Sequence, residues 1–349
     1  MNIGFLTRGH GFGHAARDLR LIRAIGEELP RTAIDVMSSG SGLRYYRDRG
    51  VDCVDLAIPD DADLSSAASW AVWRRLARDL NRWDLVIADE VVSAVPFAHH
   101  ILEVPVVVLT DWFFRDFGKP HLDRVFDQAA EVIVLDFAES HPRPPETTAP
   151  VHHAGPVVQV FDTGQDQARA AIGADPTGFV AVLTLGGMPD RPEADRMTAA
   201  VLEAWERFAR PGDRLYVLAG ARGRASAPGV RWVGTTTVPE RYYAAADTVL
   251  VDAMGFTSCE LVFNDRRVLG LTDAQTMDRF PESFRHRLAH MAAQGWLQTV
   301  EASCDRRLLW ELIAGSGAGS GAGSGAERPG TPLRAADLNA VARRVLKHG

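Results

Sequence analysis

Residues 2–18 read NIGFLTRGHGFGHAARD, and this stretch guides the interpretation of the whole chain. Residues 3–7 are an apolar run that predicts a buried strand, and residues 15–29 space their apolar side chains as a helix does. Between them, residues 9–14 form a turn, GHGFGH, that holds three glycines and two histidines. Doubly wound sheets place ligands at such strand-to-helix turns. We therefore expect a ligand site at residues 9–14.

Short apolar runs alternate with helix-like segments along the rest of the chain, which is typical of parallel sheets. The runs lack strict alternation, as expected of strands covered by helices on both faces. The strands predicted in the first half are residues 3–7, 33–38, 84–88, 104–110 and 131–135. Those predicted in the second half are residues 179–185, 214–219, 230–233, 248–251 and 267–271. The sequence predicts an α/β protein with two doubly wound, Rossmann-like parallel sheets that face each other across a cleft.

Breaks in the pattern predict the domain boundaries. Proline and glycine interrupt it in HHAGP at residues 152–156, which favours an N-terminal domain at 1–153 and a second domain at 154–332. Residues 333–349 hold an amphipathic helix, and residues 91–102 read as another helix. The run GSGAGSGAGSGA at residues 315–326 predicts a flexible, solvated loop without chemistry.

Composition limits the functional classes. The 349 residues are 46% hydrophobic, enough for two cores, and the net charge of -7 argues against a nucleic-acid partner. Three distant cysteines, without metal-ligand spacing, fit a reducing compartment. No signal peptide or membrane-spanning run is recognisable, so a cytoplasmic location is expected.

One apolar cluster leaves two interpretations open. Trp70, Val72, Trp73 and Leu76 form an apolar helical face. Packing in a core is the favoured interpretation, and peripheral membrane contact is the alternative.

The strand, the GHGFGH turn and the helix together resemble the opening of MurG-type and related UDP-glycosyltransferases. The glycosyltransferase-like region of plant arabinokinases begins in a similar way. Three stretches of the second half are also similar to the family: LGGM at 185–188, YYAAAD at 242–247 and DAMGFTSCE at 252–260. The resemblance covers nearly the whole chain and implies a GT-B fold, with the acceptor on the N-terminal half and the nucleotide sugar on the C-terminal half.

The resemblance also implies roles for individual residues. In the family, the first glycine loop faces the cleft and its last histidine lies near the acceptor, which assigns Gly11, Gly13 and His14 to the site. Helix-end amides bind the donor phosphates. The residues that match the phosphate-binding turns are Gly186, Gly187, Met188, Gly255, Phe256 and Thr257. The uracil would lie near Thr237 and Val238.

The expected ribose contact departs from the family pattern. The usual Glu-Gln pair is absent, and Glu282 occupies its approximate place. Gln275 or Asp278 are alternatives, so the donor sugar stays open.

Three acids follow predicted strands and should lie at the carboxyl edge of the first sheet. Asp89 and Glu90 follow residues 84–88, and Asp111 follows residues 104–110. A carboxylate there could orient His14 or act as the general base. Capping of a helix by Asp89 or Asp111 is the structural alternative. The histidine pairs His99–His100 and His286–His290 read as surface or packing residues.

The expected function is transfer of a sugar from a nucleotide diphosphate donor such as a UDP-sugar. Inversion at the anomeric carbon is favoured, and retention is the alternative, because the fold hosts both outcomes. The acceptor is a hydroxyl or amine of a small molecule or lipid. Neither a cofactor nor a metal ion is expected. A sugar-nucleotide epimerase or hydrolase, and a non-catalytic nucleotide-sugar-binding protein, are the alternatives. A dinucleotide site is less favoured, because the GHGFGH turn lacks the third glycine of GxGxxG and no acid ends the next strand. The sequence leaves the oligomeric state open.

Overall fold

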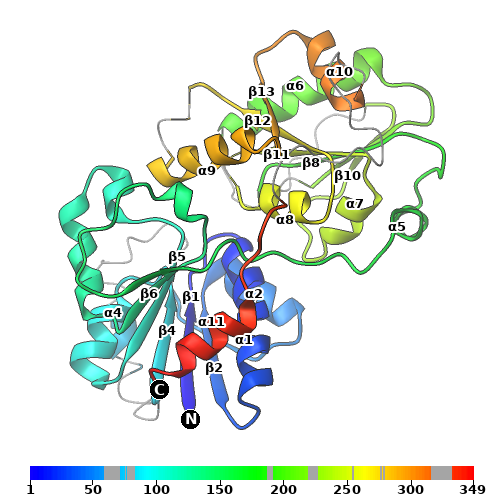
Figure 1. The fold of residues 1–349 in the computed structure, drawn as a ribbon. Helices are drawn as coiled ribbons and strands as arrows, with labels where there is room; N and C mark the ends of the chain where they lie inside the picture. The colour runs from blue at the N-terminus through cyan, green and yellow to red at the C-terminus, as the bar shows by residue number, and fades with distance from the viewer. Residues whose placement is uncertain are drawn as a thin grey trace. The chain divides into compact units, whose positions relative to one another are not determined.

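The chain folds into two compact units, as the computed structural model shows (Figure 1). It describes residues 1–58, 71–74, 76, 83–186, 192–218, 227–253, 255–275, 277, 280–315 and 332–349. The first unit comprises Met1–Val157 and Ala335–Gly349, and the second comprises Val158–Arg334. The predicted domains ended at residue 153 and residue 332, and most of the predicted loop at 315–326 lies outside the described residues.

A seven-stranded sheet forms the centre of the first unit. Its strands are β1 (Asn2–Thr7), β2 (Ala33–Ser38), β3 (Cys53–Asp55), β4 (Leu85–Asp89), β5 (Val106–Thr110), β6 (Glu131–Val134) and β7 (Val151–His153). They lie in the order β3-β2-β1-β4-β5-β6-β7, and every pair is parallel. All residues of β4 and β5 are buried, because apolar clusters cover both faces of the sheet.

The helices of the first unit cover these two faces. The α-helices with both ends among the described residues are α1 (Gly13–Glu28), α2 (Gly40–Asp48), α4 (Ala94–Phe97) and α11 (Leu338–Leu346). The shorter π- and 3-10 helices are η1 (Ala98–Leu102), η2 (Phe114–Phe117), η3 (Pro120–Gln128) and η4 (Ala138–Ser140). The expected helix at 91–102 is thus divided between α4 and η1, where His99 and His100 are exposed.

The C-terminal helix α11 belongs to the first unit although the second unit precedes it in sequence. It packs beside α1 (Figure 1), and its Val341 and Val345 share an apolar cluster with Leu21 and Ile25 of α1. The buried carboxylate of Glu131 in β6 accepts hydrogen bonds from Arg344 and, at 2.9 Å, from His348. Apolar packing and ion pairs together fix α11 to this unit.

A six-stranded parallel sheet forms the second unit. Its strands are β8 (Val180–Thr184), β9 (Arg214–Val217), β10 (Val230–Trp232), β11 (Thr248–Asp252), β12 (Val268–Thr272) and β13 (Gln298–Glu301), in the order β10-β9-β8-β11-β12-β13. Its helices are α5 (Gln165–Ile172), α6 (Pro192–Phe208), α7 (Glu240–Ala245), α8 (Thr257–Phe263), α9 (Glu282–Ala293) and α10 (Arg306–Ala314). Strands β8 and β11 are buried along their whole length.

In each sheet the strand order runs outward in one direction from the first strand and then continues from its other side in the opposite direction. In the first unit the reversal lies between β1 and β4, and in the second between β8 and β11. Ligands of open parallel sheets bind at such switch points, outside the carboxyl ends of the strands. The predicted α/β class with two doubly wound parallel sheets is confirmed.

The apolar face considered for membrane contact is part of the core. Val72, Trp73 and Leu76 are buried, and the Trp73 ring stacks on Phe97 at 5.0 Å between centroids. Trp70 lies outside the described residues. The membrane alternative for this face is therefore wrong. Among the described residues, no helix has the length and apolar character needed to cross a membrane.

Candidate active site

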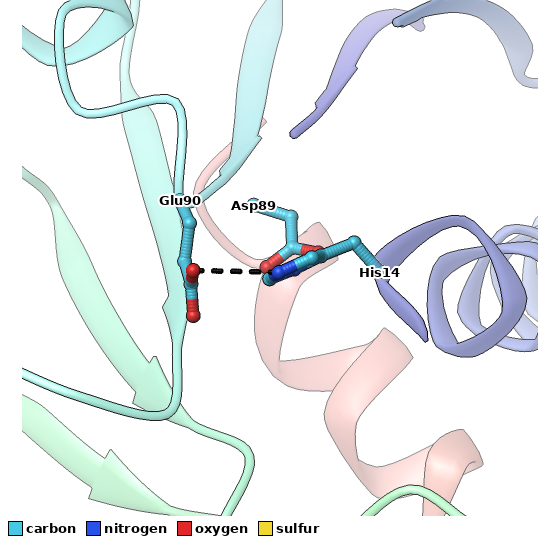
Figure 2. A group of neighbouring side chains, drawn as sticks. All are labelled: His14, Asp89 and Glu90. Carbon is cyan, nitrogen blue, oxygen red and sulfur yellow. Dashed lines mark hydrogen bonds and ion pairs between the residues drawn. The ribbon is translucent and has the colours of Figure 1, made fainter. Parts of the chain in front are cut away.

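A compact cluster of charged side chains lies at the switch point of the first sheet (Figure 2). His14 is in the first turn of α1, directly after the glycine turn that follows β1. Asp89 is the last residue of β4, the strand that pairs with β1, and Glu90 follows it. Because β1 and β4 are parallel neighbours, their carboxyl ends bring these residues together.

His14 is held by Asp89. Its Nδ1 lies 3.0 Å from Asp89 Oδ2, and its Nε2 lies 3.5 Å from Glu90 Oε2. Asp89 is fully buried, whereas the His14 side chain is 16% exposed. The sequence offered Asp89, Glu90 and Asp111 as partners of His14. The structure brings Asp89 to the ring, and Asp111 contacts Arg17 instead.

Arg17 lies one helical turn after His14 and joins the carboxylates of the cluster. Its guanidinium donates to both oxygens of Asp89, to Asp111 Oδ2 at 3.1 Å and to Glu90 Oε1 at 3.5 Å. Burial opposes the charge on Arg17, but these acids more than offset it and raise the pKa of Arg17. Arg17 therefore supplies the positive charge that lets buried acids ionise here.

The backbone at Glu90 has an unusual conformation. Its φ of 52° lies in the left-handed region, which is uncommon for a residue other than glycine. The side chain accepts from Arg8 at 2.9 Å and from the backbone amide of Asp111 at 3.3 Å. Such conformations cluster at functional sites. Burial raises the cost of ionising Glu90, yet His14, Arg17 and Arg8 hold its pKa well below the usual value.

Asp89 is ionised by the same neighbours. Burial opposes its charge, but Arg17 and His14 hold the pKa of Asp89 below its usual value. Neither Asp89 nor Asp111 caps a helix. The N-cap of α4 is Ser93 and that of η2 is Phe113, so the capping alternative is wrong.

The glycine turn has open space next to two of its three glycines. Gly11 has a φ of 73°, and a Cβ at Gly11 or Gly13 would meet no atom within 4 Å. Gly9 is different, because its Cβ would clash with Ser39 at 2.3 Å. The absence of a side chain at Gly9 thus allows the backbone to pack closely against Ser39, which follows β2. Gly11 and Gly13 instead leave the backbone accessible to a ligand.

Three donor atoms of this cluster have the spacing of a cation site. One ligand atom each from His14, Asp89 and Glu90 lies within 4.8 Å of the others. The guanidinium of Arg17 already contacts both acids. This positive side chain balances part of the negative charge of the two carboxylates.

Aromatic side chains follow Asp111 directly. The Trp112 ring contacts Phe114 and Phe117 edge-on, at 5.2 and 5.3 Å between centroids. Phe117 is 47% exposed. The turn is held by Asp116, whose Oδ2 accepts from the Phe113 amide at 2.8 Å. The first unit thus presents apolar surface at the end of β5, one residue beyond an acid of the cluster.

The switch point of the second sheet carries the predicted phosphate-binding residues. Gly186 follows β8, has a φ of 82° and is exposed. Gly255, Phe256 and Thr257 follow the neighbouring strand β11 and begin α8, where Ser258 Oγ donates to the Gly255 carbonyl at 2.7 Å. Gly187 and Met188 lie outside the described residues.

Arg287 of α9 holds the start of α8 in place. Its guanidinium lies 3.7 Å from the Phe256 ring centroid and 4.3 Å from that of Phe284, and the residue is 1% exposed. A cation between two rings is attracted to both faces, more strongly when it is desolvated. Phe256, a residue of the predicted phosphate turn, is therefore fixed against α9.

The remaining predicted donor residues lie on the same unit. Thr237 and Val238 are half-buried between β10 and α7. Glu282 is the first residue of α9, and its side chain pairs with His286 at 3.7 Å. Gln275 follows β12, and Asp278 lies outside the described residues. His290 packs on the Trp296 ring at 5.5 Å.

Sequence reasoning missed the arginines. Arg17 lies three residues after His14, so helical periodicity places both on one face of the helix, and that spacing was a usable signal. Arg8 directly follows β1. Its position at the carboxyl edge of the sheet could have suggested an ion pair with an acid that follows β4, as observed with Glu90. Arg287 lies three residues after Phe284 on α9, so helical spacing could have suggested that contact, but its contact with Phe256 at the start of α8 gave no such signal.

No protein-family model matches the sequence, and no curated protein matches it. Solved structures share the fold. The glycotransferase of kitacinnamycin has a TM-score of 0.61 at 15% identity, over 100% of this chain and 95% of its own. MurG of Acinetobacter baumannii has a TM-score of 0.56 at 14% identity, over 90% of each chain. The UDP-GlcNAc 2-epimerase of Neisseria meningitidis has a TM-score of 0.63 at 12% identity, over 100% of each.

These neighbours assign the GT-B fold, in which glycosyltransferases and UDP-GlcNAc 2-epimerases both occur. At such identities the likeness describes the fold alone.

Proposed function

We propose that the protein is a GT-B glycosyltransferase that moves a sugar from a nucleotide diphosphate donor, such as a UDP-sugar, to an acceptor hydroxyl or amine. The observation that carries this proposal is the pair of His14 and Asp89, with Nδ1 and Oδ2 3.0 Å apart at the switch point of the first sheet. A histidine held by a buried carboxylate is suited to general-base chemistry. Neighbours of the same fold include glycosyltransferases and a structure with bound UDP and glucose.

The proposed reaction is a displacement at the anomeric carbon of the donor. His14 takes the proton of the acceptor, whose oxygen or nitrogen forms the new bond to that carbon. The bond to the diphosphate oxygen breaks, and the nucleoside diphosphate leaves with the electron pair. A single displacement of this kind inverts the anomeric configuration.

The hydrogen bonds around His14 favour one tautomer for this role. Nδ1 lies 3.0 Å from both Asp89 Oδ2 and Arg17 Nη2. Arg17 Nη2 already has Asp89 and Glu90 as acceptors, whereas the ionised Asp89 needs donors. Nδ1 therefore carries a hydrogen toward Asp89. In the proposed reaction Nε2, which lies 3.5 Å from Glu90 Oε2, takes the proton of the acceptor, and the neighbouring carboxylates stabilise the positive charge that the ring then carries.

The donor is proposed to bind at the switch point of the second sheet. Backbone amides at Gly255, Phe256 and Thr257, at the start of α8, and at Gly186 would meet the diphosphate. This proposal rests on the sequence resemblance and on the positions of these residues at the carboxyl edge. Thr237 and Val238 would contact the base, and Glu282 the ribose. No cofactor besides the nucleotide sugar is proposed, and a cytoplasmic location is retained as part of the proposal.

An acceptor with an apolar part fits the first unit. Phe117, 47% exposed, contacts the Trp112 ring that follows Asp111, and Leu122 of η3 is 40% exposed. Aromatic rings bind apolar and ring-shaped groups through their faces and edges. We propose that this surface takes the apolar part of a small-molecule or lipid acceptor.

A screen of nucleotide sugars tests the proposed function. UDP-sugars and dTDP-sugars that raise the thermal midpoint of the protein are incubated with alcohols and amines, and the products are identified by mass spectrometry. We expect release of nucleoside diphosphate to depend on the acceptor. Release into water alone would identify a hydrolase, and an isomerised sugar still bound to its nucleotide would identify an epimerase. Binding without turnover across the screen would identify a non-catalytic protein.

Turnover is expected to survive removal of metal ions. Arg17 balances Asp89 and Glu90, so a divalent cation is not needed at this cluster, and in the proposed reaction helix-end amides stabilise the leaving diphosphate. The rate should be unchanged after dialysis against EDTA and after addition of Mg²⁺. A loss restored by Mg²⁺ would contradict this part of the proposal.

Removal of the Glu282 carboxylate is expected to weaken donor binding. A hydrogen bond from ribose to a charged group contributes about 1.5–3 kcal/mol, so Glu282→Ala should raise the Kd for UDP roughly 10- to 100-fold, measured by calorimetry. Glu311→Ala is the matched control, because Glu311 is a partly exposed acid of the same unit that pairs with Arg307 at 3.1 Å. Equal Kd values for both variants would assign the ribose contact elsewhere.

A further inference from the structure

A buried acid lies behind the His14–Asp89 pair. Asp18 is in α1, one turn after His14, and it is 0% exposed. Its Oδ2 accepts a hydrogen bond from Thr7 Oγ1 at 2.7 Å. Its Oδ1 is also buried, and no hydrogen bond from a described group reaches that oxygen. A buried carboxylate oxygen without a donor is costly, which points to a different protonation state.

The guanidinium of Arg17 lies nearby but makes no hydrogen bond to Asp18. The hydrogen bonds of the Arg17 guanidinium go to Asp89, Asp111, Glu90 and the His14 ring. The facing acid is Asp89, which is close enough for a hydrogen bond between the two carboxyl groups. Two acids in such a pair share one proton, because two adjacent negative charges repel each other.

The surroundings decide which acid keeps the proton. Burial and the charge of Asp89 raise the pKa of Asp18 well above its usual value, against a smaller opposing effect of Arg17. Asp89 differs, since Arg17 and His14 outweigh its burial and hold its pKa below the usual value.

We propose that Asp18 is a positioning residue that stays un-ionised and donates its carboxyl hydrogen to Asp89, thereby fixing the carboxylate that orients His14. The orphaned Oδ1 is then explained, because it carries the hydrogen. A directed chain results: Tyr46 donates to Thr7 across 2.8 Å, Thr7 donates to Asp18, and Asp18 donates to Asp89. Burial raises the pKa of Tyr46, so the first donor of this chain also keeps its hydrogen.

The hydrogen on Asp18 can be observed without any substrate. An un-ionised carboxyl group has its own C=O stretching band in the infrared spectrum. We expect this band in the wild-type protein at pH 7, and its loss in Asp18→Asn. Asp273→Asn is the control, because Asp273 is buried but its bond to Arg196 lowers its pKa, so no such band should be lost. No difference between wild type and Asp18→Asn at pH 7 would overturn the proposal.

A second variant keeps the test decisive if Asp18→Asn does not fold. Thr7→Val removes the hydroxyl that donates to Asp18 Oδ2. The band should then persist and move to higher frequency, as expected of a C=O group that loses a donor. An absent band, or one that stays at the same frequency, would contradict the chain of donors.

Turnover separates positioning from a merely structural role, and this step rests on the proposed function. Asn can donate to Asp89 and accept from Thr7, so Asp18→Asn should keep kcat within a factor of about three. Asp18→Ala should lower kcat roughly tenfold or more while the Kd for UDP stays unchanged, because Asp89 loses its support. Equal losses in both variants would overturn the positioning role. A wild-type protein that shows no turnover would refute the proposed function. If that protein still shows the infrared band, the conclusion that Asp18 is un-ionised would stand.

Discussion

Replacement of His14 by alanine is expected to lower kcat about 10²- to 10⁴-fold, which corresponds to about 3–5 kcal/mol of barrier. The reason is that Nε2 of His14 is the proposed acceptor of the proton, held through Nδ1 by Asp89. The donor is proposed to bind on the other unit, so the Kd for UDP should be unchanged. Turnover measured at saturating donor, with calorimetry for UDP, checks both parts.

Two other histidine variants sharpen this test. His14→Gln can still donate to Asp89 but offers no basic nitrogen, so it should lose as much rate as His14→Ala. His10→Ala should cost less, because His10 lies at the start of the glycine turn, four residues before His14. Equal losses in His10→Ala and His14→Ala would indicate that the loop has a structural role. A fully active His14→Ala protein would move the base to Asp89 or Asp111.

Replacement of Arg17 by methionine is expected to destabilise the first unit by about 3–5 kcal/mol at neutral pH. Methionine fills similar space but leaves Asp89, Glu90 and Asp111 without the guanidinium that they share. For a domain of about 150–250 residues this corresponds to a fall of roughly 6–20 °C in the thermal midpoint. Arg23→Met, on the exposed side of the same helix, is the control and should change the stability by about 0.5 kcal/mol or less.

The pH dependence of this difference gives a second measurement. In the wild type the pKa values of Asp89 and Glu90 are lowered, so their stabilising effect is present above the usual carboxyl pKa and is lost as the pH falls through the lowered values. Without Arg17 these acids take up protons more readily. The midpoints of wild type and Arg17→Met should therefore converge as the pH falls from 7 towards about 4. A constant difference would mean that Arg17 acts through packing alone.

The sequence predicted the central strands and the edge strand β10 well, but it missed the other three edge strands, β3, β7 and β13. β4, β5, β8 and β11 are buried on both faces, and such strands appear in a sequence as continuous apolar runs. β7 contains His152 and His153, and β13 is mostly exposed, so neither has an apolar run to recognise. The glycine and proline that break the pattern, Gly155 and Pro156, come just after β7. The boundary predicted from them, at residue 153, therefore lies four residues before the end of the first unit at Val157.

The candidate site was predictable to the extent that parallel strands bring their carboxyl ends together. That rule placed His14, Asp89 and Asp111 at one edge from sequence alone. It could not distinguish which acid contacts His14, because that depends on which strand lies next to β1. Asp89 ends the neighbouring strand β4, whereas Asp111 follows β5, one strand further away. It also could not assign the partners of Arg17 or Asp18, since these depend on how α1 is rotated over the sheet.

The position of α11 has a consequence for the order in which the chain folds during synthesis. Residues 338–348 leave the ribosome after the whole of the second unit, yet they cover α1 and supply the hydrogen-bond donors around Glu131. Until then, Leu21 and Ile25 lack part of their apolar cover, and a buried carboxylate lacks its partners. The chain leaves the first unit after Val157 and returns to it at Ala335. Next to these two points, the Ala336 amide donates a hydrogen bond to the Pro156 carbonyl at 2.9 Å. The second unit is therefore an insertion that emerges complete before the unit that contains it can close.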